Sequence, residues 1–366
     1  MAERTHIITK DISRQVLMTG DYYRNNHPGG ISAVVSYWSR HIEDLQFYPT
    51  YKSGGKLTKG WWFVTSYIRL ALRMMTDRKV RLIHQHTAAD GSFWKNVRIQ
   101  KLCRFFGKKT ILHIHASRFK DFHDEASADD RNRILDALRN ADRLIVLSES
   151  WKQWFMSIGI EEEKLTILHN ITPEPTHIPE AKTDDGKVHF LFMGEIGQRK
   201  GVFDLLNGIA AHKEEAAGKI ELRIGGNRNE EKLLDFISAN GLEDIVRFEG
   251  WVSGDKKLRL LNWADVYVLP SFNEGLPISI LEAMSYGCPI ISTPVGGIPE
   301  VVDDNGILVT PGNQEEIWRA IKKYIDHPET ISQEGKASLK NVRTYLPAHV
   351  MTHLRKIYLE MAEVIE

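Results

Sequence analysis

This sequence is poor in several features that mark other protein classes. Its 366 residues include only two cysteines, Cys103 and Cys288, which lie far apart in apolar surroundings. Two such cysteines predict reduced thiols in a cytoplasmic protein and argue against a disulfide-stapled fold. No stretch approaches about 18 uncharged apolar residues, so no membrane-spanning helix is expected. The first residues also lack the apolar run of a signal peptide.

A dinucleotide-binding signature is missing as well. No Gly-x-Gly-x-x-Gly run follows a strand with an acidic residue about 20 positions later, which argues against a nicotinamide-dependent oxidoreductase. Neither low-complexity segments nor repeats of fixed period occur. With 42% hydrophobic and 26% charged residues, the composition is that of a globular protein, and the length favours two domains.

The net charge of zero conceals an asymmetry between the two halves. Residues 1–170 contain 27 basic and 18 acidic residues, for a net charge of +9, and the remainder carries −9. Within residues 51–120 the numbers are 16 basic and 2 acidic. Such a local excess predicts an anionic partner for one half only. No nucleic-acid recognition motif accompanies it, so nucleic acid is not the partner expected.

Short apolar runs alternate with amphipathic segments, which predicts βα units and an α/β fold with parallel sheets. The expected strands are 16–18, 80–83, 110–114, 144–147 and 165–168 in the first half, and 188–194, 220–224, 246–248, 266–269 and 290–292 in the second. A polar, proline-containing linker at 172–186 separates the two series. The amphipathic stretch 348–364 predicts a final helix.

The most informative segment holds two glutamates eight positions apart, Glu274 and Glu282. Pro270 ends a buried strand before them, and Pro277 suits the first position of a helix, because it needs no amide hydrogen there. Glu274 is therefore expected in a strand-to-helix loop and Glu282 about a turn and a half into the helix. The free amides of the first turn favour anions and hydroxyls, so the segment suits a sugar nucleotide. A solvated acidic pair would not explain the apolar neighbours of Glu282.

The run from Asn273 to Met284 resembles the E-x7-E signature of the retaining glycosyltransferases of family 4. The resemblance covers nearly the whole chain and is strongest over 188–302. It implies the GT-B fold, in which two Rossmann-like domains with parallel sheets face each other across a cleft. The first domain, 1–171, would bind the acceptor, and the helix at 348–366 would cross back onto it. The second domain, 186–345, would bind the nucleotide sugar.

The resemblance also implies roles for particular residues. Glu274 would act as a catalytic residue on the sugar, and Glu282 would bind the ribose hydroxyls. Further donor-binding residues would come from the same segment and from two glycine-containing loops, namely Gly275, Leu276, Ile278, Ser279, Gly29, Gly30, Arg199 and Lys200.

Two adjacent cations lie in the turn from Gly194 to Gly201 that follows a strand. Arg199 offers a bidentate fork and Lys200 a point charge, and together they could neutralise a diphosphate leaving group. Many family members carry arginine directly after the first glycine, where this chain has Glu195, and we infer that the later cations take over that role. A solvent-exposed basic turn is the alternative. Because no Asp-x-Asp metal-chelating signature occurs, neither a metal nor a cofactor is expected.

The glycines Gly29 and Gly30 lie in the segment from His27 to Ser32, between the first strand and a helical pattern. Glycine lets the backbone approach a phosphate closely, and a helix start supplies amide donors. A Gly-Gly pair alone is a weak signal, and a plain loop is the alternative. The position nevertheless matches the glycine loop of the family.

Histidines recur with period two in two neighbouring strands. His84 and His86 share one face of the first strand, and His113 and His115 share one face of the next. A metal cluster is conceivable but disfavoured, because no third carboxylate or cysteine ligand lies nearby in the sequence. His115 matches the family histidine that faces the donor sugar, and it is the second catalytic residue predicted. A satisfied structural histidine is the alternative.

These features predict a retaining, metal-independent glycosyltransferase that moves a sugar from a UDP- or GDP-sugar to an acceptor hydroxyl. The alternatives with the same fold are a sugar-nucleotide epimerase and a non-catalytic nucleotide-sugar-binding protein.

A helix at 94–106 would present two unlike faces. Its core face would carry Ile99, Leu102, Cys103 and Phe106. Its opposite face would mix cations with apolar side chains, namely Lys95, Arg98, Lys101 and Arg104 with Trp94, Val97 and Phe105, and nearby Lys56, Lys59, Trp61 and Trp62 could extend it. Such a face suits an anionic membrane, so we expect peripheral binding to the inner face of the plasma membrane and a lipid-linked or cell-surface saccharide as acceptor. A solvated basic face is the alternative.

Overall fold

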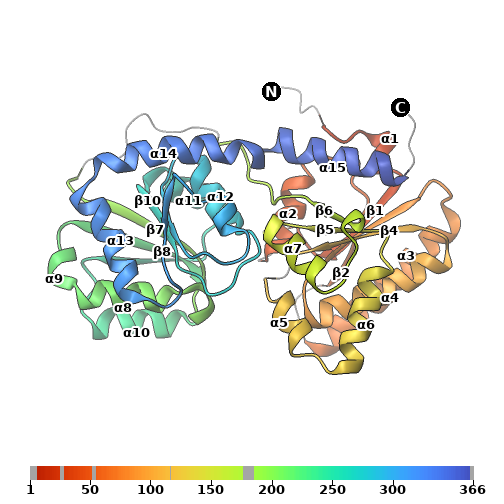
Figure 1. Cartoon of the computed structure of the whole chain (residues 1–366), viewed down its shortest axis with the longest axis horizontal. Helices are drawn as coiled ribbons and strands as arrows, with labels where there is room; N and C mark the ends of the chain where they lie inside the picture. Colours follow the sequence, from red (N-terminus) through yellow and green to blue (C-terminus); the bar gives the residue numbers. More distant parts are fainter. Residues whose placement is uncertain (1–5, 25–28, 52–54, 116, 176–184, 363–366) are drawn as a thin grey trace. The chain divides into compact units, whose positions relative to one another are not determined.

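The computed structural model describes residues 6–24, 29–51, 55–115, 117–175 and 185–362. The chain forms two compact units (Figure 1). The first unit comprises Met1–Ile171 together with Pro347–Glu366, and the second comprises Thr172–Leu346. Each is described by itself below.

The first unit is built on a six-stranded parallel sheet with strand order β2-β1-β3-β4-β5-β6. Its strands are β1 (Val16–Asp21), β2 (Phe47–Tyr51), β3 (Leu82–Thr87), β4 (Lys109–Ile114), β5 (Arg143–Val146) and β6 (Leu165–Ile167). Five of them were expected from the sequence. The exception is β2, an edge strand that contains Pro49 and is mostly half-buried, so its apolar pattern is weak.

Helices cover both faces of this sheet. They are α1 (Lys10–Ser13), α2 (Gly30–Trp38), α3 (Lys56–Thr76), α4 (Asp90–Phe105), α5 (Phe119–Asp124), α6 (Ala128–Arg139), α7 (Glu149–Ser157) and α15 (Pro347–Ala362). Figure 1 shows α3 and α4 on one side of the sheet and α2 with α15 on the other. On the first side, Leu17 and Ile83 pack against residues of α3 and α4, including Leu70 and Cys103.

The second unit repeats the plan with strand order β12-β11-β10-β7-β8-β9, again all parallel. Its strands are β7 (Val188–Glu195), β8 (Ile220–Asn227), β9 (Val246–Gly250), β10 (Val266–Leu269), β11 (Ile290–Ser292) and β12 (Gly306–Leu308). The short strand β12 was not expected, because its three residues are only partly buried or exposed. The predicted α/β fold with parallel sheets is confirmed.

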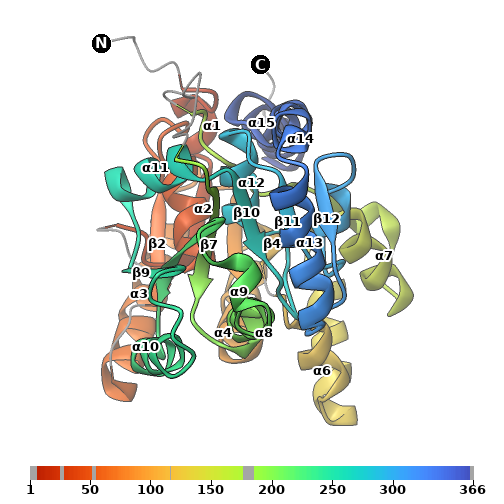
Figure 2. The ribbon, with the colours of Figure 1, turned by 90° about the vertical axis from the view of Figure 1, so that its left-hand side faces the viewer.

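The helices of the second unit also lie on both faces of its sheet. They are α8 (Val202–Ala211), α9 (Lys213–Ala216), α10 (Glu230–Ala239), α11 (Gly254–Trp263), α12 (Ile278–Ser285), α13 (Gln314–Asp326) and α14 (Glu329–Asn341). Helix α8 packs against α13, and α12 packs against α14 and the strands β10 and β11. Figure 2 shows α8 and α10 below the strands and α12 above them. In the described part of the chain, no helix has the length and apolar character needed to cross a bilayer.

Candidate active site

The loop between β10 and α12 carries the first of the two glutamates singled out above. Strand β10 ends at Leu269, and α12 begins at Ile278. Pro277 was predicted as the first helical residue, but it is the N-cap, with φ −70° and an extended ψ of 121°. Its carbonyl accepts the amides of Ile280 and Leu281 at 3.2 and 3.4 Å. Pro277 therefore still marks the start of the helix, which begins one residue later than predicted.

A turn at Gly296 and Gly297 packs against this loop. The amide of Gly297 donates to the carbonyl of Gly275 at 2.7 Å. Gly296 has a φ of +56°, and a Cβ atom there would lie 2.1 Å from the carbonyl oxygen of Glu274. Any larger residue at 296 would push the glutamate loop away, so the sequence needs glycine at this position.

Glu274 is buried, with 7% of its surface exposed, and its carboxylate is paired. Its Oε1 atom accepts hydrogen bonds from the ammonium of Lys200 and, at 2.8 Å, from the hydroxyl of Ser271. Lys200 ends the short turn Gln198–Lys200 that follows β7, the strand next to β10. Two predicted site residues, 74 positions apart, therefore meet at the carboxyl ends of adjacent strands.

Glu282 lies inside α12 with 5% of its surface exposed. Its Oε1 atom accepts a hydrogen bond from Lys257 of α11 at 2.5 Å. This second buried ion pair was not anticipated, because Lys257 lies among exposed charges in the sequence and only the packing of α11 beside α12 brings it to Glu282. Ser271 was also missed, although it lies only three residues before Glu274 in the same loop.

Arg199 is held next to the glutamate loop. Its guanidinium donates to the carbonyl of Asn273 at 3.2 Å and to the carboxylate of Glu195 at 3.3 Å. Arg228 donates to the other oxygen of Glu195 at 3.1 Å. The carbonyl of Arg199 in turn accepts the amide of Phe272 at 2.9 Å. Glu195, which stands where many family members have arginine, thus lies between Arg199 and Arg228.

Four more predicted donor-binding residues belong to the same structure. Gly275 and the buried Leu276 continue the loop, and Ile278 and Ser279 form the first turn of α12. The side chain of Ser279 is hydrogen-bonded to Tyr267, whose hydroxyl donates to the carbonyl of Met193 at 2.9 Å. Burial raises the pKa of Tyr267 above its usual value, so this tyrosine stays neutral.

The predicted glycine loop lies in the first unit. Helix α2 begins at Gly30, and Gly29 before it has a φ of +148°, a backbone conformation that favours glycine. Ser32 ties the start of the helix to the carbonyl of Tyr22 at 3.0 Å. The preceding His27 and Pro28 lie outside the described residues.

His115 directly follows β4 and is anchored from two sides. Its amide donates to the carbonyl of Thr87 at 2.9 Å, and its Nε2 lies 2.8 Å from Nδ1 of His86. Burial lowers the pKa of His115 to about 3, so the ring is neutral at physiological pH. A neutral imidazole can donate or accept a hydrogen bond but offers no positive charge to a phosphate.

Two protein families match this chain. The model of the glycosyl transferases group 1 matches residues 174–340, and that of glycosyltransferase family 4 matches residues 32–172. Together the two matches span most of the chain, and both describe glycosyltransferases. The predicted family is confirmed, and the two matches follow one another along the chain with their junction beside the start of the second unit.

Curated relatives match parts of this chain. The amylovoran biosynthesis glycosyltransferase AmsK of Erwinia amylovora is 25% identical over 61% of this chain and 56% of its own length. The putative colanic acid biosynthesis glycosyltransferase WcaL of Escherichia coli K12 is 26% identical over 51% of this chain and 48% of its own length. The chain thus spans about half the length of these two relatives.

Solved structures share the fold along almost the full chain. Anabaena Alr3699/HepE in complex with UDP superposes with a TM-score of 0.71 at 16% identity, covering 96% of this chain and 100% of that one. Sucrose-phosphate synthase from Thermosynechococcus elongatus gives a TM-score of 0.74 at 16% identity, covering 95% and 99%. These likenesses confirm the predicted GT-B fold class.

Proposed function

We propose that this protein transfers a sugar from a nucleotide-sugar donor to an acceptor hydroxyl with retention of the anomeric configuration. The observation that carries the proposal is the buried contact of Lys200 with Glu274 at the ends of β7 and β10. A carboxylate that can accept sugar hydroxyls lies beside a cation that can bind phosphate, which is the pairing that a sugar diphosphate needs. The match of residues 174–340 to the model of the glycosyl transferases group 1 supports this function.

The donor would replace the contacts that these residues make with one another. Glu274 would bind sugar hydroxyls and stabilise the positive charge that develops at the anomeric carbon. Lys200 and Arg199 would bind the diphosphate, and the first-turn amides of α12 would add hydrogen bonds. Glu282, held by Lys257, would accept hydrogen bonds from the ribose hydroxyls. UDP bound to the HepE structure supports a nucleotide of this kind.

Retention is proposed because the chain resembles the retaining glycosyltransferases of family 4. Glu274 already receives hydrogen bonds from Lys200 and Ser271 and is assigned to the sugar hydroxyls, so it is not positioned as a nucleophile. We therefore propose that the acceptor attacks from the face that the diphosphate leaves. Diphosphate charge would be neutralised by the two cations without a metal ion.

The acceptor we propose is a saccharide of a cell-surface polysaccharide pathway, carried on a lipid. AmsK and WcaL, which match parts of this chain, are named for amylovoran and colanic acid biosynthesis. A lipid-linked acceptor requires a surface that approaches a membrane, and the basic first unit offers a candidate.

Helix α3 of the first unit has an exposed apolar stripe. Six side chains at helical spacing, each between 49% and 91% exposed, form this stripe, namely Leu57, Trp61, Val64, Ile68, Leu72 and Met75. The opposite side of α3 packs inward through Leu70 and Met74. Among its flanking charges are Lys59, Arg69, Arg78 and Lys79, with only one acid, Asp77, between residues 56 and 79. An amphipathic helix of this kind fits an anionic bilayer surface.

The structure corrects the membrane face predicted on α4. Trp94 and Val97 pack against the hydrophobic core instead of pointing away from it, and Arg98 and Lys101 line a hollow of about 380 Å³ with Arg133. Lys95 lies over the ring of Tyr51 at 4.7 Å, and burial lowers its pKa. Of the apolar residues on that face, Phe105 is 81% exposed. The side chain of Lys56 is not among those described. The membrane surface we propose is therefore centred on α3.

Vesicle sedimentation tests the membrane surface. The protein should pellet with phosphatidylglycerol vesicles at low salt and remain in solution with zwitterionic ones. Trp61→Ser combined with Leu72→Ser should release it, as should Arg98→Glu with Lys101→Glu, by lowering the positive charge. Leu234→Ser removes an apolar side chain that is 51% exposed in the second unit and should change nothing. Equal, negligible binding to both vesicle types would leave a soluble acceptor as the better proposal.

A donor panel tests the transfer function. UDP-, GDP- and ADP-sugars are compared by thermal shift, because a bound ligand raises the melting temperature. Each donor that binds is then incubated with and without a saccharide acceptor. Transfer with retained configuration supports the proposal. Binding without turnover would indicate a binding protein, and interconversion of the donor sugar would indicate an epimerase.

A further inference from the structure

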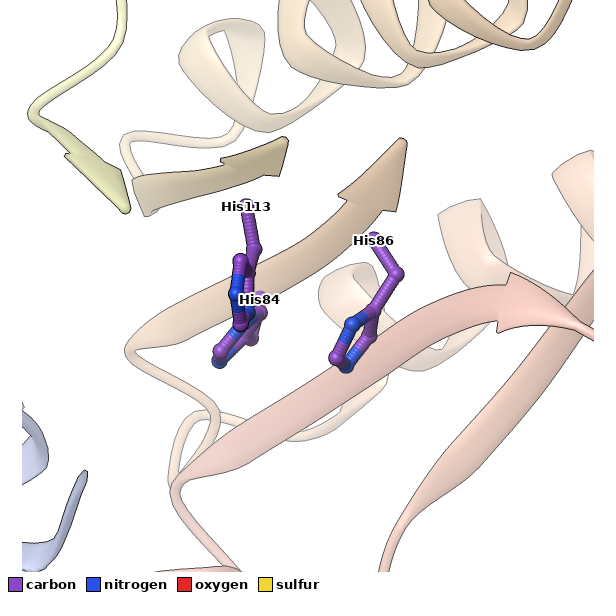
Figure 3. Close-up of side chains that lie close together, drawn as sticks. All are labelled: His84, His86 and His113. Atoms are coloured by element: carbon purple, nitrogen blue, oxygen red, sulfur yellow. The ribbon is translucent and has the colours of Figure 1, made fainter. Parts of the chain in front are cut away.

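A cluster of histidines lies on the side of the first sheet that faces α2 and α15. His84 and His86 extend from β3, and His113 extends from the neighbouring strand β4, where it is the register partner of His86 (Figure 3). The rings are stacked or tilted against one another, with centroids 4.6 to 5.3 Å apart. One ring nitrogen from each of the three lies within 4.8 Å of the others. The third ligand that the sequence did not offer nearby is therefore supplied by the adjacent strand.

These three rings are enclosed. Each is at most 1% exposed, and the indole of Trp38 packs against all three at 5.2 to 5.6 Å. A neutral imidazole keeps a lone pair on one nitrogen, as a metal ligand must.

The hydrogen bonds leave two ring nitrogens unused. Nδ1 of His84 lies 2.8 Å from the hydroxyl of Tyr358, and Nε2 of His84 lies 3.2 Å from Nδ1 of His113. Nδ1 of His86 lies 2.8 Å from Nε2 of His115. Within the described residues, Nε2 of His86 and Nε2 of His113 are buried with no hydrogen-bond partner. Such orphaned nitrogens in a packed interior call for an explanation, and a bound ion is one of the few available.

We propose that His84, His86 and His113 bind a divalent transition metal ion of the zinc type. Imidazole ligands without nearby oxygen ligands favour zinc over magnesium or calcium. Zinc–nitrogen bonds of about 2.0–2.1 Å place tetrahedral ligand atoms roughly 3.3 Å apart, so the rings need only small rotations. Three protein ligands leave the fourth position to a water molecule.

The partners of the other ring nitrogens support this assignment. Binding of the ion by Nε2 of His84 would replace the contact of that atom with Nδ1 of His113. When Nε2 of His84 and of His86 bind the ion, each Nδ1 carries its proton and donates, to Tyr358 and to His115 respectively. A second hydrogen bond of this kind orients most metal-binding histidines. The site would thereby also fix the position of His115.

Zinc titration of chelator-treated protein tests the proposal. Calorimetry should show one tight ion per chain that excess magnesium does not displace, and zinc should raise the melting temperature. His86→Gln and His113→Gln should each weaken binding at least tenfold. His349→Gln, an exposed histidine of the same unit, should bind zinc as wild type does. His189→Gln tests the other residue group with metal-binding potential, Asp185, His189 and Glu221, and should also leave binding unchanged.

A second variant covers the case in which the histidine variants do not fold. Tyr358→Phe keeps the ring and removes only the hydroxyl that orients His84, so it should weaken zinc binding about tenfold to hundredfold. The proposal is overturned if wild-type protein neither binds zinc at one ion per chain nor melts higher with it. Zinc binding that survives His86→Gln and His113→Gln, or that disappears in His189→Gln, would overturn it equally.

Discussion

The two units share one plan of six parallel strands, yet they treat buried polar side chains in opposite ways. In the second unit, Glu274 and Glu282 are buried and each meets a lysine. In the first unit, histidines on β3 and directly after β4 are kept neutral by burial. The second unit therefore buries opposite charges in contact with each other, and the first unit buries uncharged side chains that can form hydrogen bonds.

This difference teaches how each unit is suited to its ligand. A buried ion pair gains little stability in itself, because desolvation of both charges offsets their attraction. It does keep charged groups in place for a ligand that brings both hydroxyls and phosphates. Neutral rings, by contrast, can be packed tightly without counter-ions, and the positive charge of the first unit is left on its surface.

The largest effect is expected from Gly296→Ala in the second unit. The new Cβ would overlap the carbonyl of Glu274, and the φ of +56° is unfavourable for alanine. We expect a loss of transfer activity greater than about a hundredfold, since displacing a catalytic group by about 1 Å has that effect. Gly91→Ala in the first unit, where an added Cβ meets no atom within 4 Å, should keep wild-type activity. Equal activity of both variants would show that the loop geometry is unimportant.

Smaller but specific losses are expected from Lys200→Ala and Glu282→Ala. Each would remove a charge-assisted hydrogen bond that we propose to the donor, worth about 1.5–3 kcal/mol, so donor binding and turnover should fall roughly tenfold to hundredfold. Donor affinity from thermal shift and initial rates measure the loss. Lys219→Ala, an exposed lysine of the same unit, and Arg98→Ala in the first unit serve as controls for lost positive charge. If Lys200→Ala and Glu282→Ala both bind the donor as wild type does, the assignment of these two residues to the donor is wrong.

Lowering the pH should change the stabilising contributions of buried histidines in opposite directions in the two units. Burial would lower the pKa of His189, but its contacts with Asp265 and Asp185 raise it above the ordinary value. Its stabilising contribution is therefore complete below about pH 6.5 and is lost as pH rises through the higher pKa of the folded state. The buried histidines of the first unit act oppositely, and their contribution falls as pH drops below about 6.5.

Melting curves of His189→Gln and wild type measure this difference. The variant should lose several degrees relative to wild type at pH 6 and less at pH 8.5. A deficit of His189→Gln that grows with pH would mean that this histidine is neutral in the folded state.

The smallest effect is expected from chelation. Because Arg199 and Lys200 are assigned to the diphosphate, transfer should survive EDTA with little change in rate. If EDTA abolishes transfer and magnesium or manganese restores it, an oxygen-bound metal ion in the second unit neutralises the diphosphate instead. Loss restored by zinc alone would instead point to the histidine cluster of the first unit.

Patterns that depend on nearby residues were predictable from the sequence. The alternation of apolar runs gave the order of strands and helices in both units. The sequence Pro277-Ile278-Ser279 marked the start of α12 within one residue, because proline restricts its own φ and cannot donate. The short or half-buried strands β2 and β12 were missed, since a strand of three to five residues without strong apolar character leaves little periodic signal.

Site residues followed the same division. Arg199 and Lys200 were selected from a turn that follows a strand, and Glu274 and Glu282 from their spacing of eight positions. The structure brings Arg199, Lys200 and Glu274 around one loop. Lys257 was not selected, because its contact with Glu282 spans 25 residues and depends on the packing of α11. Trp94 and Val97 were placed on the wrong face of α4 because a helical wheel does not show that the core extends around both sides.

By itself, the sequence determined which segments become strands and helices and where only glycine or proline fits, because backbone conformation is restricted locally. It also set the opposite charges of the two halves. Tertiary structure alone decided which lysine meets which glutamate, which histidines lie together without charge, and which face of α3 stays exposed. Those outcomes depend on burial, and burial is created when elements far apart in the chain pack against one another.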